Sequence, residues 1–151
     1  MGKRRKGREI VLQSLYASLI SGADLMDVLD DQILRRSSAA ESADFARELA
    51  GKIKLHRSEL DRRLKTLISR NRDHDRLGTL EIVILTIGLA ELEHSPDVPY
   101  RVVINEALDL AHRYCEDGAV GFVNGVLDKA AAGLKPPAAG SPDLPPAKDD
   151  A

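Results

Sequence analysis

The chain has 151 residues, of which 43% are hydrophobic by type and 30% are charged, and its formal net charge is −2. This length predicts a single domain that buries about two-thirds of the surface exposed by its unfolded chain. The one cysteine, Cys115, excludes an internal disulfide framework and is typical of a reducing compartment. No run of about 18 apolar residues is present, so we expect a cytoplasmic protein without a membrane-spanning helix.

Positive charge is concentrated at the N-terminal end of the chain. The basic leader, residues 3–8, contains five cations: Lys3, Arg4, Arg5, Lys6 and Arg8. With Glu9 this segment carries +4, so the rest of the chain carries −6. A basic segment that continues into an apolar helix is typical of proteins that bind nucleic-acid phosphates. Because only five residues are aromatic, we expect contacts with a short single-stranded RNA rather than stacking on many bases.

Apolar residues recur with helical spacing through most of the chain, and no period-two pattern predicts a strand. A first helix over residues 5–21 ends at Gly22 and has one apolar face, which consists of Leu12, Leu15, Tyr16 and Leu19. A short second helix follows, with apolar residues at four-residue intervals from Leu25 to Ile33. These patterns predict two amphipathic helices that pack through one face each.

The middle of the chain contains three further predicted helices. Ser38 and Glu41 have the spacing of a capping box, which predicts the start of a third helix that buries Phe45. A fourth helix begins near Ser58, and the charged residues 70–76 are expected to form a solvated connection. Residues 80–92 are apolar on almost every side, so we expect this fifth helix to be the buried centre of the fold.

Two helices are predicted after the prolines at 96 and 99, over residues 100–114 and 120–132. Gly121 and Gly125 lie four residues apart in the last helix, where glycine is unfavourable by about 1 kcal/mol relative to alanine. This spacing predicts that another element approaches its backbone closely. From residue 135 the chain is rich in Pro, Ala, Gly and Asp, so we expect a domain over residues 1–134 and a disordered tail over 135–151.

Residues suited to catalysis or metal binding are few. Glu91 and His94 have the spacing of a helical di-iron motif, and Glu106, Asp109 and His112 follow on the next predicted helix. A di-iron site needs a second such unit, which the sequence lacks. No phosphate loop, nucleophile elbow or paired acid and base is present either. We therefore expect neither an enzyme nor a bound metal or cofactor.

Three sequence blocks resemble one protein family. They are the leader with its helix, from Arg4 to Tyr16, and two C-terminal blocks, Asp97 to Leu108 and Gly121 to Lys129. Together they closely resemble the NusB family of bacterial transcription antitermination factors, over roughly residues 3 to 132. The resemblance implies an all-α fold of about seven helices in two packed three-helix subdomains.

The resemblance also implies a function. Family members bind the boxA element of nascent ribosomal RNA jointly with NusE, a small-subunit ribosomal protein, and help RNA polymerase to read through terminators. By matching position, the RNA-binding residues would be Lys3, Arg4, Arg5, Arg8, Gln13 and Phe122. The residues facing the ribosomal protein would be Tyr16 and Glu81. Some relatives self-associate, so a homodimer is possible on the same grounds.

The chain departs from the family pattern at three positions. Gly121 and Thr86 stand where relatives often have a basic residue and an arginine, and Gly118 replaces a polar side chain found in some of them. These differences imply weaker RNA contacts from the C-terminal part and more reliance on the leader. An alternative interpretation is a helical protein-interaction module that does not bind RNA directly.

Overall fold

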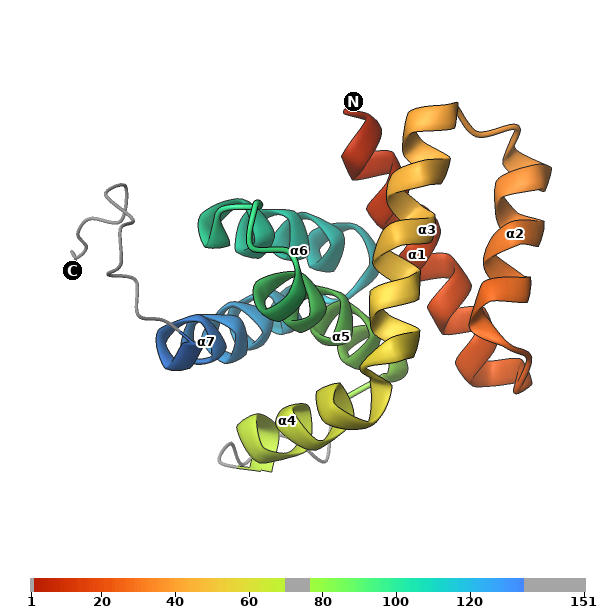
Figure 1. The fold of residues 1–151 in the computed structure, drawn as a ribbon. Coiled ribbons are helices and arrows are strands. Elements are labelled where there is room, and N and C mark those ends of the chain that lie inside the picture. Colours follow the sequence, from red (N-terminus) through yellow and green to blue (C-terminus); the bar gives the residue numbers. More distant parts are fainter. Residues whose placement is uncertain (1, 70–76, 135–151) are drawn as a thin grey trace.

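The computed structural model describes residues 2–69 and 77–134, and within these ranges it contains seven α-helices and no strand (Figure 1). The helices are α1 (Lys3–Ser21), α2 (Leu25–Arg36), α3 (Ala40–Leu55), α4 (Arg57–Ser69), α5 (Thr79–His94), α6 (Tyr100–Tyr114) and α7 (Asp117–Leu134). The all-α prediction is confirmed. The expected solvated connection at 70–76 and the expected disordered tail at 135–151 lie outside the described residues.

Six of the helices form two groups of three. α1, α2 and α3 pack against one another on one side of the molecule, and α5, α6 and α7 pack together on the other (Figure 1). α1 and α3 both contact α5, which joins the two groups, and α4 packs mainly on α5. This arrangement confirms the two three-helix subdomains that the family resemblance implied. Among the described residues, no helix combines the length and apolar character needed to span a bilayer.

α5 is the buried centre of the fold, as its apolar composition predicts. Every residue from Val83 to Glu91 is buried, and the helix contacts α1, α3, α4, α6 and α7. A helix with no polar face is stable in water only when neighbours cover all its sides. α5 is therefore the element on which both three-helix groups are assembled.

Two helix ends follow the capping rules closely. α1 ends at Gly22, whose φ of 83° lies in the left-handed region that glycine adopts without strain. Asp24 caps α2 by accepting hydrogen bonds from the backbone N–H groups of Met26 and Asp27.

The predicted capping box at the start of α3 is wrong. The N-cap residue is Ala39, which has no side-chain acceptor. The Ser38 hydroxyl instead donates to the carbonyl oxygen of Ile33 at 3.4 Å, and the Glu41 carboxylate lies 3.3 Å from the Lys3 ammonium. The first backbone N–H groups of α3 consequently have no side-chain cap.

The apolar face predicted for the first helix is confirmed only in part. Leu12 and Leu15 are buried, whereas Tyr16 and Leu19 are 38% and 40% exposed. α1 lies between α2, α3 and α5, so the face that it buries is rotated toward Ile10 and Leu12. The sequence pattern alone does not reveal this rotation, because both faces of α1 carry apolar side chains.

Another element packs closely on the helix backbone at Gly7, and not at the two glycines that the sequence predicted, Gly121 and Gly125. A Cβ added at Gly121 or Gly125 would meet no atom within 4 Å. A Cβ at Gly7 would lie 2.7 Å from Cδ2 of Phe45 and 3.0 Å from the carbonyl oxygen of Ser42. The contact of α1 with α3 therefore depends on the missing side chain at Gly7.

We expect Gly7→Ala to destabilise the protein by about 1–3 kcal/mol, because the methyl group collides with Phe45 and with the α3 backbone. The matched variant Gly125→Ala meets open space and should stabilise the helix by up to about 1 kcal/mol. Urea unfolding of both variants measures the difference. Equal stability of the two variants would contradict the close packing at Gly7.

Candidate nucleic-acid interface

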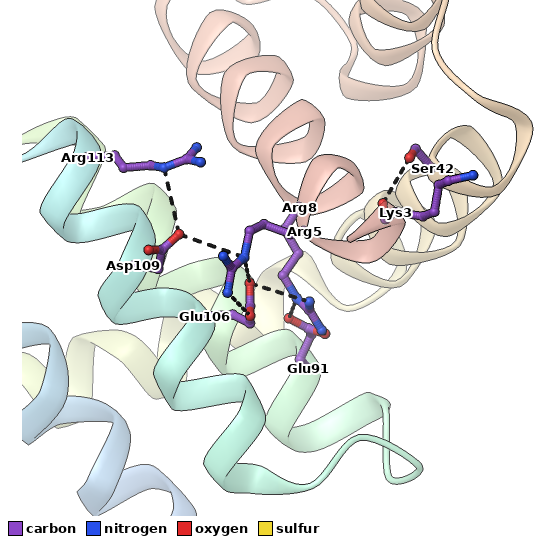
Figure 2. A network of polar contacts seen from close by, with 8 residues as sticks. All are labelled: Lys3, Arg5, Arg8, Ser42, Glu91, Glu106, Asp109 and Arg113. Carbon is purple, nitrogen blue, oxygen red and sulfur yellow. Dashed lines mark hydrogen bonds and ion pairs between the residues drawn. The ribbon is translucent and has the colours of Figure 1, made fainter. Parts of the chain in front are cut away.

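The basic leader is the first part of α1 rather than a free arm. α1 begins at Lys3, so its five cations are distributed around a helix and point toward different neighbours. Figure 2 shows that Arg5 and Arg8 point toward acidic residues of the second three-helix group. Because the leader is helical, some of its cations pair with acidic residues inside the fold and the others face solvent.

Arg8 makes internal contacts, whereas the sequence suggested an exposed cation. The side chain is only 3% exposed, and its Nε and Nη2 atoms donate to the two carboxylate oxygens of Glu91, both at 2.8 Å (Figure 2). Its guanidinium also lies 4.9 Å from the centre of the Phe45 ring. The Arg8 guanidinium is thus held by Glu91 along one edge and by the Phe45 ring on one face, away from solvent.

Arg5 forms a second ion pair across the same boundary. Its Nε and Nη2 atoms donate to Glu106 at 3.1 and 2.9 Å, and Asp109 lies 3.9 Å from Nε (Figure 2). The hydrogen bond to Glu106 raises the pKa of Arg5, and the same bond lowers the pKa of Glu106. The side chain remains 40% exposed. Arg5 therefore joins α1 to α6 and still reaches the surface.

Three leader cations remain at the surface. Lys3, Arg4 and Lys6 are all exposed. The partner of Lys3 is the exposed Glu41, and Arg4 lies 5.4 Å from the centre of the Phe45 ring. Lys6 has no ion pair with any residue in the described ranges. Because exposed pairs contribute little, these three side chains can exchange their contacts for a phosphate group.

Gln13 lies in a chain of polar contacts that crosses the exposed side of α1. The polar chain consists of Arg113, Glu9, Tyr114, Gln13 and Arg36. Tyr114 donates to Glu9 at 2.6 Å and accepts from the Gln13 amide at 3.1 Å, while Arg36 donates to the Gln13 oxygen. Arg113 donates to Glu9 at 2.8 Å. These bonds fix the orientation of the Gln13 amide, which the sequence leaves undetermined.

Arg36 and Tyr114 are members of this surface that sequence reasoning missed. They contact Gln13 from positions 23 and 101 residues away. No local motif marks either residue, because the contact exists only after α2 and α6 have packed beside α1. Burial and the bond to Glu9 raise the pKa of Tyr114, so its hydroxyl keeps its proton at neutral pH.

The C-terminal residues implied by the family resemblance belong to α5 and α7. Phe122 is half-buried on α7, which packs mainly on α5 and α6. Thr86 is buried, and its hydroxyl donates to the carbonyl oxygen of Ile82 at 2.8 Å. Gly118 and Gly121 are exposed on α7. Position 86 therefore supplies no surface group in this chain.

The two residues expected to face a protein partner occupy different elements. Tyr16 is 38% exposed on α1, next to Leu19 and to Ile20, which is 64% exposed. Glu81 is half-buried in the first turn of α5. Its carboxylate packs against Gly78, where a Cβ added to the glycine would lie 2.7 Å from Oε1. Exposed apolar side chains grouped on one helix are typical of protein interfaces.

Candidate groups for catalysis or metal binding have other roles in the structure. Glu91 is bound by Arg8, and His94 stacks on His56 with ring centres 3.6 Å apart and planes 6° apart. His56, Glu59 and His94 lie close enough to share an ion, but the in-plane lone pairs of parallel rings do not converge. Burial, and secondarily Glu81, raises the pKa of the Cys115 thiol to about 11, so it stays protonated at neutral pH.

Comparison with known proteins gives one consistent result. The model of the NusB family matches residues 5–132. Transcription antitermination protein NusB of Proteus mirabilis is 37% identical over 85% of this chain and 92% of its own length. The same protein of Myxococcus xanthus is 36% identical over 91% of this chain and 100% of its own length.

Solved structures share the fold. T. maritima NusB in one crystal form superposes with a TM-score of 0.79 and 27% identity, covering 88% of this chain and 93% of its own. A crystal structure of the antitermination factors NusB and NusE in complex with dsRNA has the same TM-score and 25% identity, covering 88% and 98%.

We expect Arg8→Ala to destabilise the protein by about 3–5 kcal/mol, because it leaves the Glu91 carboxylate buried without its partner. The double variant Arg8→Met with Glu91→Leu should lose less, since neither charge is then buried. Arg35→Ala removes the exposed pair with Asp31 and should cost less than about 1 kcal/mol. Urea unfolding distinguishes these outcomes, and a small loss for Arg8→Ala would contradict a structural role.

Proposed function

The chain belongs to the NusB family, and we propose that it is a transcription antitermination factor that binds single-stranded boxA RNA together with the ribosomal protein NusE. The observation that carries this proposal is the group of exposed cations at the start of α1, Lys3, Arg4 and Lys6, beside a fixed polar chain. The names of the relatives support the antitermination role, and the solved complex of NusB and NusE with dsRNA supports RNA binding together with NusE.

The proposed RNA surface follows the exposed side of α1. Lys3, Arg4 and Lys6 bind backbone phosphates, and the exposed part of Arg5 adds a further positive charge. Gln13 offers its remaining amide N–H to a base edge, in an orientation set by Tyr114 and Arg36. Arg8 acts in this scheme as a positioning residue, because it holds α1 on α5.

We assign two further parts of the interface by the family resemblance. Phe122 on α7 stacks on a base at the edge of the RNA surface. Tyr16 and Glu81 face NusE, with Tyr16 and the neighbouring Ile20 providing the apolar contact. The complex then joins the antitermination assembly on RNA polymerase in the cytoplasm. Residues 1–134 carry these contacts as one domain, without a catalytic step and without a requirement for residues 135–151.

A second candidate function is a protein-interaction module that does not bind RNA directly. Arg8 pairs with Glu91 inside the fold, and Arg5 pairs in part with Glu106. These ion pairs leave fewer cations at the surface for RNA, which favours the second candidate function. In this case the chain binds NusE through Tyr16 with or without RNA.

The affinity of this chain for RNA should fall with salt concentration less steeply than it would if all five leader cations bound phosphates. Neutralisation of about three phosphates on a single strand gives a slope of log affinity against log salt near −2. Raising salt from 50 to 200 mM then weakens boxA binding by roughly 20-fold, measured by fluorescence anisotropy. The triple variant Lys3→Ala, Arg4→Ala, Lys6→Ala should lose this salt dependence while keeping its helical circular dichroism. A flat response in the unmodified chain would contradict the proposed RNA surface.

Tyr16→Ala should weaken NusE binding by about tenfold, as expected when a central interface aromatic is truncated. Tyr100 is also 38% exposed, on α6, so Tyr100→Ala is a matched control that should leave binding unchanged. Pull-down or titration calorimetry with and without boxA RNA measures both. NusE binding that is identical with and without RNA, combined with no RNA binding, would favour the second candidate.

A further inference from the structure

A cavity of about 450 Å³ lies between the start of α1, the end of α2 and the start of α3. Its walls include Lys3 and Lys6 from α1, Arg36 at the end of α2, and Ala39 and Ser42 at the start of α3, with Ile10 at its apolar side. Among the residues that the structure describes, no acidic side chain lines it. A cavity of this size can admit a phosphate group together with part of the adjoining nucleotides.

The positive charge of this cavity is largely uncompensated. Lys6 has no ion pair within the described residues, and the partner of Lys3 is Glu41, which is outside the lining and exposed. Arg36 donates to the neutral amide of Gln13, a bond that orients the guanidinium without cancelling its charge. Three cations therefore line a space to which no described residue contributes a carboxylate.

The backbone of α3 adds donors to the same space. Ala39 provides no cap, and the two serine hydroxyls nearby are used elsewhere: Ser38 donates to Ile33, and Ser42 donates to the carbonyl oxygen of Lys3 at 2.9 Å. The first N–H groups of α3 are thus left for another acceptor, at the positive end of the helix dipole. Of the residues that carry these N–H groups, Ser42 lines the cavity together with Lys3 and Lys6. A backbone donor thus lies beside side-chain charge, which is the chemistry that binds phosphate.

We propose that this cavity binds a backbone phosphate of the RNA, so that the strand continues from α1 onto the connection between α2 and α3. This inference rests on the proposed function. Lys3 and Lys6 belong both to the cavity and to the proposed RNA surface, and Arg36 links the cavity to Gln13. A strand that contacts Gln13 therefore passes the mouth of the cavity.

A pair of variants at Ala39 separates charge from helix capping. Asp and Asn are equally good N-caps, so both Ala39→Asp and Ala39→Asn should keep or improve folding. Only Asp places a negative charge in the cavity. Either cap also takes up first-turn N–H groups of α3, so we expect Ala39→Asn to weaken binding of a boxA RNA extended by several nucleotides at both ends by about threefold at 50 mM salt. Ala39→Asp should weaken it by about tenfold more, because it adds a negative charge.

A lysine pair tests the same site through salt dependence. Lys6→Ala should reduce the salt slope by about 0.7, whereas Lys65→Ala, which removes an exposed lysine on α4, should leave it unchanged. Amide NMR shifts of residues 40–42 should respond to the RNA and vanish in Ala39→Asp. RNA binding that is equal in Ala39→Asp and Ala39→Asn overturns the cavity proposal and leaves the proposed function intact.

Two other outcomes also overturn the cavity proposal. Failure of the unmodified chain to bind the RNA at all removes the proposed function together with the inference. Amide shifts that appear with inorganic phosphate, without any effect of Ala39→Asp on RNA affinity, would assign the cavity to free phosphate instead of an RNA strand.

Discussion

The buried ion pair between Arg8 and Glu91 is the interaction on which the arrangement of the two three-helix groups depends. It connects α1 to α5 with two hydrogen bonds of 2.8 Å, and Arg5 connects α1 to Glu106 of α6 beside it. Apolar packing between helices is tolerant of small rotations, whereas a bidentate pair fixes both distance and orientation. The pair thereby sets which side of α1 faces solvent. Lys6, Gln13 and the RNA surface proposed above all follow from that choice.

The sequence was sufficient for the fold class and for the central helix. Residues 100–114 were predicted as a helix and form α6 with the same bounds, and the apolar run predicted at 80–92 is buried from Val83 to Glu91. Gly22 ends α1 as predicted. Each of these features depends on neighbours within a few positions, such as a glycine, a proline or an unbroken apolar run.

The site was less predictable, because its contacts join residues that are far apart in the chain. Five cations in sequence were interpreted as one exposed surface, yet Arg8 pairs with a residue 83 positions away. Charge counts cannot distinguish a solvated arginine from a buried one whose partner is on another helix. The capping box at Ser38 failed for a similar reason: the hydroxyl found an acceptor in α2, and Glu41 found Lys3.

Gly7 has a consequence for sequence variation within the family. The Phe45 ring contacts the bare backbone at Gly7 and lies under the guanidinium groups of both Arg4 and Arg8. A larger residue at position 7 leaves room for the guanidinium groups only if the ring at position 45 is replaced by a smaller side chain. The two positions should therefore covary among homologues, and a lineage that loses the aromatic ring is the one in which alanine or serine at position 7 becomes acceptable.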